Sequence, residues 1–403
     1  MNETEEVRLD VREAQWVATG RGVSRRTFVG MGCALLAGLA LPSVGRAAGA
    51  SATSEKSSSS SDGSAASFTS PLDDARDNGD GTITIHDMAG REVTIPKQVK
   101  TVMGAANPDG IIIYSINPSL LTGWTFDLSD DAKKYLTQEA AALPKITSVS
   151  KWEDPNKEEI LRMAPDVISV AVDLTNVDLS LYDDLTAEVG VPIVVVDAEL
   201  AHLANTYRFL GEILGEREQC EKLAGFIDQT FDDVSATMEG VADADRVRVL
   251  YSTGDAGTQT CGDSNWNGQF VTPAGGVNVC DTDQTSGFAD VSMEQVLGWQ
   301  PDVIISTATG DKSSIYSAQE WADVKAVQQD QVYAAPKYPF SWVDKPTGAN
   351  RIIGVKWTNS VLYPDKADYD IREAVSEFYD LFYHYELGDD EVDQLLDTHV
   401  ELA

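Results

Sequence analysis

One eleven-residue unit occurs twice in this chain. Residues 158–168 and residues 294–304 are identical at six of their eleven positions and lie 136 residues apart. Each copy predicts a short amphipathic helix that ends before a proline, because the residue before a proline disfavours the α region; a buried apolar strand follows, at 167–172 and 303–305. A period of 136 residues is far too long for a solenoid. The repeat therefore predicts two lobes of similar construction, and a cleft between two lobes commonly holds a ligand.

The rest of the folded part alternates apolar strands with amphipathic helices. A chain of this pattern belongs to the α/β class, and we expect two Rossmann-like lobes. Residues 81–95 read as a hairpin that turns at Ala89-Gly90, and Asn107 is placed to cap a helix through residues 111–116. Further strands are expected at residues 99–103, 120–126, 191–197, 246–252 and 331–335, and a late helix at residues 352–362.

Two consecutive helices separate the lobes. The first ends at Gly215, and the second runs over about residues 216–238, which is about 35 Å at 1.5 Å per residue. Because a stiff helix is the only connection, we expect lobes that move little relative to each other. The predicted organisation is an N-terminal lobe at residues 81–205, a linker helix at 206–240 and a C-terminal lobe at 241–403.

The first eighty residues do not read as part of the fold. Arg25-Arg26 precedes an apolar run at residues 29–41, which is too short to span a bilayer, and Ala48-Gly49-Ala50 offers a cleavage site. Residues 1–50 are therefore predicted to be a twin-arginine signal peptide that exports the protein to the periplasm or the cell surface. Residues 51–80 follow as a disordered tether, since ten of residues 51–70 are serine. Cys33 falls inside the signal, so the mode of membrane retention stays open.

The chain is strongly acidic, with 30 Lys and Arg against 65 Asp and Glu and a formal net charge of −35. That field disfavours binding to nucleic acid or to an anionic membrane surface. Export permits disulfides. Cys261 and Cys280 could pair, closing a loop of about 20 residues worth roughly 3 kcal/mol, but the sequence does not decide whether they do. Cys220 lies on the apolar face of a helix and is predicted to be an inert core residue.

No catalytic motif is present. The sequence lacks Gly-x-Ser-x-Gly, His-Glu-x-x-His and the Gly-Lys-Ser/Thr phosphate loop. We therefore expect neither an enzyme nor a bound cofactor. The four histidines, His86, His202, His384 and His399, do not stand at predicted strand ends, so no metal ion held by the protein alone is expected. A metal inside a small-molecule chelate remains possible.

A family resemblance follows from the order of these features. The segment Gly90-Arg91-Glu92-Val93-Thr94-Ile95-Pro96, both Pro-Asp-Val-Ile copies, the linker helix and residues 340–357 resemble the substrate-binding proteins of ABC importers for ferric siderophores, haem and cobalamin. The resemblance covers about residues 82–385. It implies a monomer that captures a metal chelate, a ferric siderophore first and haem or cobalamin next, and delivers it to ABC permease subunits.

The resemblance also implies a ligand site. Such proteins bind their ligand between the lobes at the strand carboxyl ends, in agreement with the general rule for α/β folds. Aromatic rings suit large planar or chelate ligands, although each ring could instead belong to a lobe core, as we expect for Trp357. Lys151, Lys345 and Arg351 would favour an anionic chelate if they face the cleft. The implied cleft residues are Asn107, Trp124, Trp152, Phe288, Trp342 and Arg351.

The same resemblance implies a docking surface for the permease. The family uses one glutamate per lobe to contact permease arginines, and the matching residues are Glu158 and Glu294, the first residues of the repeated unit. The structural alternative is that each glutamate stabilises its helix N-terminus, by about 0.3–1 kcal/mol. Trp152 and Phe288 both stand six residues before these glutamates, and this equal spacing favours a duplication that includes ligand contacts.

Two other functions remain open. A binding protein for free metal, or for a different metal complex, would share the fold but would need clustered histidines and carboxylates. A surface sensor or adhesion protein on the same fold would need no permease at all.

Overall fold

The computed structural model describes residues 68–149, 154–175, 177–282 and 284–402. The predicted signal peptide and residues 51–67 of the predicted tether lie outside these residues, and for them the prediction stays untested. The prediction of disorder is wrong for the end of the tether, because Arg76–Asp77 form a strand paired with residues 83 and 84, and Phe68 and Leu72 pack against the core. Within the described residues no helix is both long and apolar enough to cross a bilayer.

The N-terminal lobe is built on a parallel sheet of three strands, in the order β4-β5-β6. Its strands are short apolar runs with buried side chains, as expected for a sheet that is covered on both faces. Parallel neighbours need crossover connections, and helices supply them here. The elements are β4 (Val102–Gly104), α1 (Asn107–Ile116), α2 (Asp130–Lys133), α3 (Gln138–Ala141), α4 (Lys157–Met163), β5 (Val167–Val172), α5 (Ser180–Val189) and β6 (Ile193–Asp197).

A small antiparallel sheet precedes this lobe. It consists of β1 (Arg76–Asp77), β2 (Thr82–His86) and β3 (Glu92–Pro96), in the order β1-β2-β3. The pair β2–β3 is the expected hairpin, in register at Thr84 and Thr94, and Gly90 takes a positive φ of 78° in its turn.

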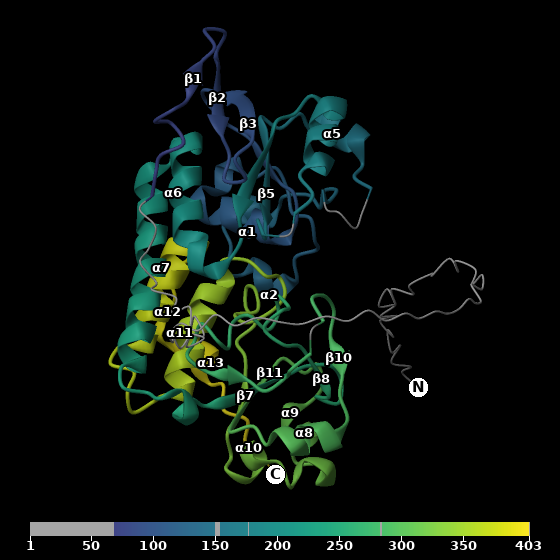
Figure 1. The fold of residues 1–403 in the computed structure, drawn as a ribbon, viewed down its shortest axis with the longest axis vertical. Helices are drawn as coiled ribbons and strands as arrows, with labels where there is room; N and C mark the ends of the chain where they lie inside the picture. The colour runs from purple at the N-terminus through teal and green to yellow at the C-terminus, as the bar shows by residue number, and fades with distance from the viewer. Residues whose placement is uncertain (1–67, 150–153, 176, 283, 403) are drawn as a thin grey trace, which may run out of the picture. The chain divides into compact units, whose positions relative to one another are not determined.

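The C-terminal lobe holds a second parallel sheet, in the order β12-β11-β7-β9. A short antiparallel pair, β8 with β10, lies next to β7 of this sheet. Figure 1 shows this lobe below the N-terminal lobe, with β7 and β11 at its centre. Its elements are β7 (Arg248–Ser252), β8 (Gln259–Thr260), β9 (Val277–Asn278), β10 (Ala289–Asp290), α8 (Met293–Trp299), β11 (Val303–Ser306), α9 (Lys312–Tyr316), α10 (Lys325–Gln328) and β12 (Val332–Ala334).

The repeated sequence folds into the same unit in both lobes. Helices α4 and α8 end in the left-handed residues Ala164 (φ 45°) and Gln300 (φ 44°), and each is followed by the proline and a buried strand. The repeated aspartate also has one role twice: Asp166 accepts from the backbone N–H of Thr101, and Asp302 from that of Arg248. Each carboxylate thus fixes the start of the neighbouring strand, which confirms that the repeat encodes two similar lobes.

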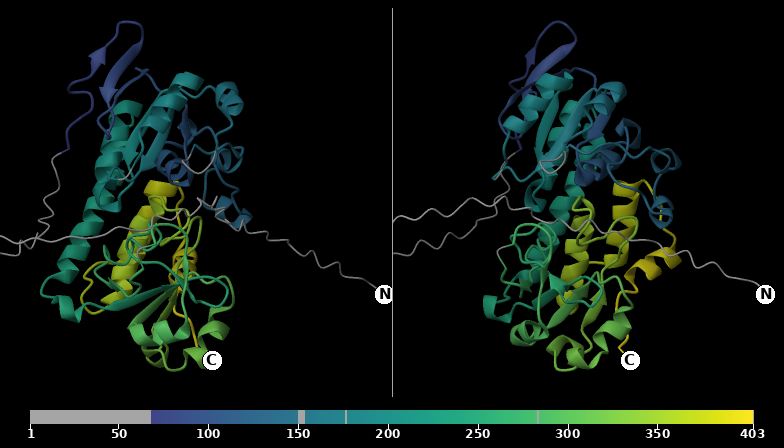
Figure 2. Two further views of the ribbon diagram at one scale, coloured as in Figure 1. Left: turned by 45° about the vertical axis from the view of Figure 1, so that its right-hand side comes forward. Right: turned by 90° about the vertical axis from the view of Figure 1, so that its right-hand side faces the viewer.

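Long helices connect the lobes. Helix α6 (Leu203–Leu214) ends at Gly215, and α7 (Arg217–Met238) has 22 residues, which is about 33 Å. Both lie side by side along one edge of the structure (Figures 1 and 2). The linker helix is therefore present where the sequence predicts it, although the predicted domain boundaries themselves stay untested.

The last three helices pack against these connecting helices and against each other. Helix α11 (Asn350–Leu362) packs on α7, α12 (Ile371–Tyr383) packs on α1, α7 and α11, and α13 (Asp389–Leu396) packs on α12. The Tyr114 hydroxyl of α1 donates to the backbone oxygen of Tyr383 at 2.6 Å. The sequence placed these helices in the C-terminal lobe, whereas α12 contacts the N-terminal lobe directly. One apolar core runs through both lobes and through the helices α6, α7, α11, α12 and α13. Such a shared core favours lobes whose relative orientation does not change.

Two local predictions differ from the structure. The expected strand at residues 120–126 is a 3-10 turn, Pro118–Leu120, followed by isolated bridges at Leu121 and Trp124. Asn107 does not cap α1. It is the first helical residue, and Ala106 is the cap, whose N–H donates to the Asp109 carboxylate at 3.0 Å. The Asp109 carboxylate thus satisfies the backbone N–H of the cap residue, which is the contribution that the third helical residue makes to a capping box.

Asp109 makes the stability of this lobe depend on pH. Burial raises the pKa of its carboxyl from 3.8 to about 8, although N–H groups of Ala171 and Ala106 act in the opposite direction. Between these pH values the native state keeps a proton that the unfolded chain has lost. The free energy of unfolding should therefore fall as pH rises through this window, by up to about 1.4 kcal/mol per pH unit.

Asp109→Asn should flatten that dependence, because asparagine does not titrate. Urea denaturation of both proteins between about pH 5.5 and pH 7.5 measures the two slopes. We expect the variant to be less stable overall, since one of the two N–H groups then faces an amide N–H. Equal slopes would show that Asp109 does not titrate in this range.

Candidate functional site

A cleft of about 720 Å³ lies between the two lobes. Its N-terminal wall comes from the end of β5 and the start of α5, and its C-terminal wall comes from the loops after β8 and β9. The site therefore lies at carboxyl ends of strands, as the sequence predicts for this fold. The lining residues are Val172, Asp173, Val177, Asp178, Leu181, Tyr182, Ser264, Trp266, Thr285 and Ser286.

The N-terminal wall is acidic and partly apolar. Asp173 accepts hydrogen bonds from the backbone N–H and the hydroxyl of Thr175, at 2.8 and 2.7 Å. Asp178 accepts from the hydroxyl and the N–H of Ser180, and these bonds hold the pKa of Asp178 below its ordinary value. Leu181 is 37% exposed, which is unusual for a large apolar side chain in this structure. This wall offers negative charge and an apolar surface to a ligand.

The C-terminal wall is held by a buried arginine. Arg351 is 1% exposed, and its Nη1 donates to the backbone oxygen of Trp266 at 2.8 Å. Its guanidinium also lies 5.8 Å from the centre of the Trp266 ring, within the range of a cation–π contact. Burial lowers the pKa of Arg351 to about 10. Arg351 thus positions the ring that lines the cleft, while its own charge is covered.

The residues that the sequence predicts for the ligand site differ in how much of each side chain is exposed. Phe288 is partly buried, with the Lys345 ammonium 4.6 Å from its ring centre, and it follows the lining residue Ser286 by two positions. Asn107 is partly buried and accepts a hydrogen bond from the Thr125 hydroxyl at 2.8 Å. Trp152 and Lys151 lie outside the described residues.

Two predicted rings belong to the core. Trp124 is 1% exposed, its indole N–H donates to Ala140, and it packs against Tyr114, Phe126 and Phe340. Trp342 is fully buried and packs edge-on against Trp357. In this structure Trp124 is enclosed by Tyr114 of α1 and the segment before α11, whereas Trp342 is covered by side chains of α11 and α12. Trp357 is a core residue, as expected.

The two repeated glutamates are both exposed. Glu158 lies in the first turn of α4 and Glu294 in the first turn of α8, so equivalent positions of the two lobes present them. This placement suits a docking contact and equally suits helix stabilisation.

The cysteines of the folded part are buried free thiols. Burial raises the pKa of Cys220, Cys261 and Cys280. Cys220 fits the predicted inert core residue, and Cys261 and Cys280 are unpaired in this structure.

The sequence reasoning missed several residues of this region. Asp173 follows a predicted strand directly, so its position could have identified it, whereas Asp178 lies in the loop before α5. His202 lies five residues after β6, with its Nδ1 2.8 Å from Asp197, the last residue of that strand. The statement that the histidines avoid strand ends is therefore wrong for His202, because a short turn folds it back onto the strand.

Comparisons with known proteins agree with this architecture. The family described as "Periplasmic binding protein" matches residues 120–339, which include both repeats and the linker helix. The Molybdate-binding protein MolA of Haemophilus influenzae is 26% identical over 331 residues, 74% of this chain and 90% of that protein. The Vitamin B12-binding protein of Salmonella choleraesuis is 31% identical over 162 residues, 40% of this chain and 58% of that protein.

A solved structure shows the same fold. An ABC transporter solute binding protein from Sulfurospirillum deleyianum superposes with a TM-score of 0.71 and 28% identity, covering 77% of this chain and 98% of that chain. The family match extends over more than half of the sequence. Membership of this family accounts for the two lobes, the linker helix and the cleft together. The chain belongs to the periplasmic binding protein family, in the helical-linker class of ABC importer substrate-binding proteins that its sequence resembles.

Proposed function

We propose that this protein is exported by the twin-arginine route, captures a metal chelate in the cleft between its lobes and delivers it to an ABC permease. A ferric siderophore is the first candidate, and haem or cobalamin the next. The observation that carries the proposal is the cleft itself, at about 720 Å³ with an aromatic ring, hydroxyls and carboxylates in its walls. Small-molecule sites typically measure about 300–1,000 Å³, so a chelate of this size class fits.

The charge of the cleft walls limits which chelates can bind. Asp173 and Asp178 supply negative charge to one wall. Of the three basic residues that the sequence placed near the site, Lys345 lies over the Phe288 ring and Arg351 behind Trp266, and Lys151 lies outside the described residues. A chelate that is neutral or cationic on the side facing these aspartates is therefore favoured over a strongly anionic one.

A bare oxyanion is the second candidate, because the relative from Haemophilus influenzae is a molybdate-binding protein by name. The Arg351 guanidinium donates to the backbone oxygens of Trp266 and Thr347 and pairs with no carboxylate of the described residues, and a buried guanidinium can recognise an anion. Size argues against it. A water molecule occupies about 30 Å³, so a five-atom oxyanion would fill only a small part of the cleft unless the walls closed on it.

Trp266 gives the test of this function. Titration of the full mature protein with a ferric siderophore, haem, cobalamin and molybdate, one at a time, should show saturable quenching of tryptophan fluorescence with one of the chelates. Trp266→Ala should weaken that binding by about 2 kcal/mol, roughly thirtyfold, since a buried aromatic contact at a site centre is worth that much.

The matched control is Trp299→Ala, a tryptophan of similar partial burial at the end of α8. It should leave affinity unchanged. Saturable binding of molybdate alone would replace the chelate with the oxyanion, and no quenching by any of the four would remove the proposed cargo classes.

A further inference from the structure

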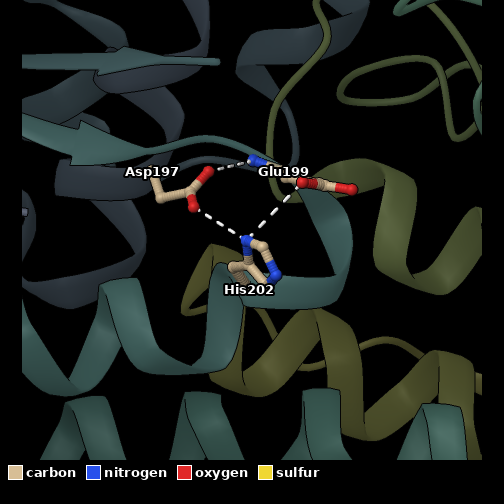
Figure 3. Close-up of side chains that lie close together, drawn as sticks. All are labelled: Asp197, Glu199 and His202. Carbon is tan, nitrogen blue, oxygen red and sulfur yellow. Dashed lines mark hydrogen bonds and ion pairs between the residues drawn. The ribbon is translucent and has the colours of Figure 1, made fainter. Parts of the chain in front are cut away.

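Three side chains converge at the carboxyl end of β6: Asp197, Glu199 and His202 (Figure 3). The His202 Nδ1 lies 2.8 Å from Asp197 Oδ2 and 3.5 Å from Glu199 Oε2. Figure 3 shows both carboxylates on the same side of the imidazole ring, facing Nδ1. Within the described part of the chain this is the one set of three such side chains whose ligand atoms all lie within 4.8 Å of one another.

These separations match those of ligands around a metal ion. Zinc binds histidine nitrogen and carboxylate oxygen at about 2.0–2.2 Å, so adjacent ligand atoms in a tetrahedral or octahedral shell stand roughly 3.0–3.4 Å apart. The observed 2.8 and 3.5 Å bracket that range. All three ligand atoms lie within 4.8 Å of one another, so rotations of the half-exposed Glu199 and His202 side chains would bring them around one ion.

Of the three side chains, that of Asp197 is held firmly, whereas those of Glu199 and His202 can move. Asp197 is 8% exposed and is paired with Val172 in the sheet, and its second oxygen accepts from the Glu199 N–H at 3.0 Å. The Thr206 hydroxyl donates to the Asp197 carbonyl at 2.7 Å. The side chains of Glu199 and His202 are about half exposed, at 54% and 53%. A fixed carboxylate with two mobile partners lets an ion enter from solvent.

The position of the three residues is a second, independent observation. Val172, the sheet partner of Asp197, lines the cleft, and Asp173 follows it. Neighbouring strands are about 4.8 Å apart, so the cluster stands one strand away from the ligand cleft on the same edge of the sheet. Other histidine–carboxylate pairs lie away from the cleft residues and offer a single carboxylate, as in His86 with Asp74 and His399 with Asp330.

We propose that Asp197, Glu199 and His202 bind a divalent transition-metal ion of the zinc, cobalt or nickel type. One imidazole with two carboxylates is a donor set suited to these ions, and two carboxylates would neutralise the charge of the ion. The imidazole would carry its proton on Nε2, so that Nδ1 presents its lone pair to the metal. Water would complete the shell on the exposed side. This site is separate from the cargo of the cleft and does not depend on the proposed chelate.

Calorimetric titration of the full mature protein, free of histidine tags and stripped with chelator, tests the site. Zn²⁺, Co²⁺ and Ni²⁺ should each be titrated without any chelate cargo, and one ion per chain is expected. His202→Ala should lower the affinity at least about tenfold, since loss of even a supporting partner of a metal ligand typically costs about 10–100-fold. Asp197→Asn should do the same. Co²⁺ absorption in the visible range should appear in the natural protein and disappear in His202→Ala.

The matched controls are His86→Ala and His399→Ala, which remove an exposed histidine beside one carboxylate. Both should keep the natural affinity. His202 is half exposed, so its variant is expected to fold, and a thermal melt without metal checks this. Absence of binding by the natural protein, or equal losses in His202→Ala and His86→Ala, would mean that the three residues form only a hydrogen-bonded turn after β6.

Discussion

Replacing Glu158 and Glu294 together with alanine is expected to abolish uptake by cells while the purified protein keeps its cargo affinity. Both glutamates are exposed in the first turn of equivalent helices, α4 and α8. Neither is among the cleft-lining residues. If each glutamate pairs with a permease arginine, the loss of two close charge pairs, at about 1.5 kcal/mol or more each, weakens docking roughly a hundredfold or more.

The control for this experiment is Glu218→Ala with Glu373→Ala. These glutamates are also exposed in the first turns of helices, α7 and α12, but they do not belong to the repeat. The control therefore removes the same formal charge and a similar helix-dipole contribution, about 0.3–1 kcal/mol per site, and in addition the surface ion pair of Glu218 with Lys222. Equal uptake by the two double variants would show that Glu158 and Glu294 only stabilise their helices. Lost cargo affinity would instead place them in the binding site.

Gly354→Ala is expected to have the largest effect on stability. Gly354 lies in α11, where its Cα faces the backbone of Trp342, and an added Cβ would collide with the Trp342 carbonyl oxygen and carbon. Backbone atoms cannot rotate away as a flexible side chain can. The segment before α11 also carries Asp344, which accepts from the Tyr251 hydroxyl at 2.6 Å. We expect destabilisation by about 3 kcal/mol or more, at the upper end of overpacking effects.

Chemical denaturation measures this change, and Gly225→Ala is its control. Gly225 lies in α7 with open space where a Cβ would be, so alanine there should stabilise the protein by about 1 kcal/mol through helix propensity alone. A small effect of Gly354→Ala would mean that α11 can move away from the Trp342 segment. It would also mean that the core between the lobes is less rigid than the structure indicates.

The repeat was the strongest guide to the fold because it rests on local chemistry. A proline after a short helix acts within a few residues, so both copies could be interpreted from the sequence. The linker helix was predictable for the same reason, since its apolar spacing and the glycine before it are local signals. The hairpin at residues 81–95 followed from alternation and a turn glycine.

The ligand site was predicted less well, because it depends on which segments meet. Trp124 and Trp342 are aromatic residues of the kind that contacts chelate ligands, yet both are buried in the core, Trp124 against α1 and Trp342 against α11 and α12. Trp266 has no distinguishing neighbours in the sequence, yet Arg351, 85 positions later, fixes it at the cleft. The spacing of Asp197, Glu199 and His202 after a predicted strand is a local signal that could have revealed their cluster.

The sequence by itself determined the two lobes, the linker helix and the family, because periodicity, proline position and the repeat act over short distances. The tertiary structure alone decided which rings face the cleft and which arginine is buried behind one of them. These features depend on contacts between residues far apart in the chain, and burial at such contacts, not residue type, decides whether a side chain meets a ligand or the core.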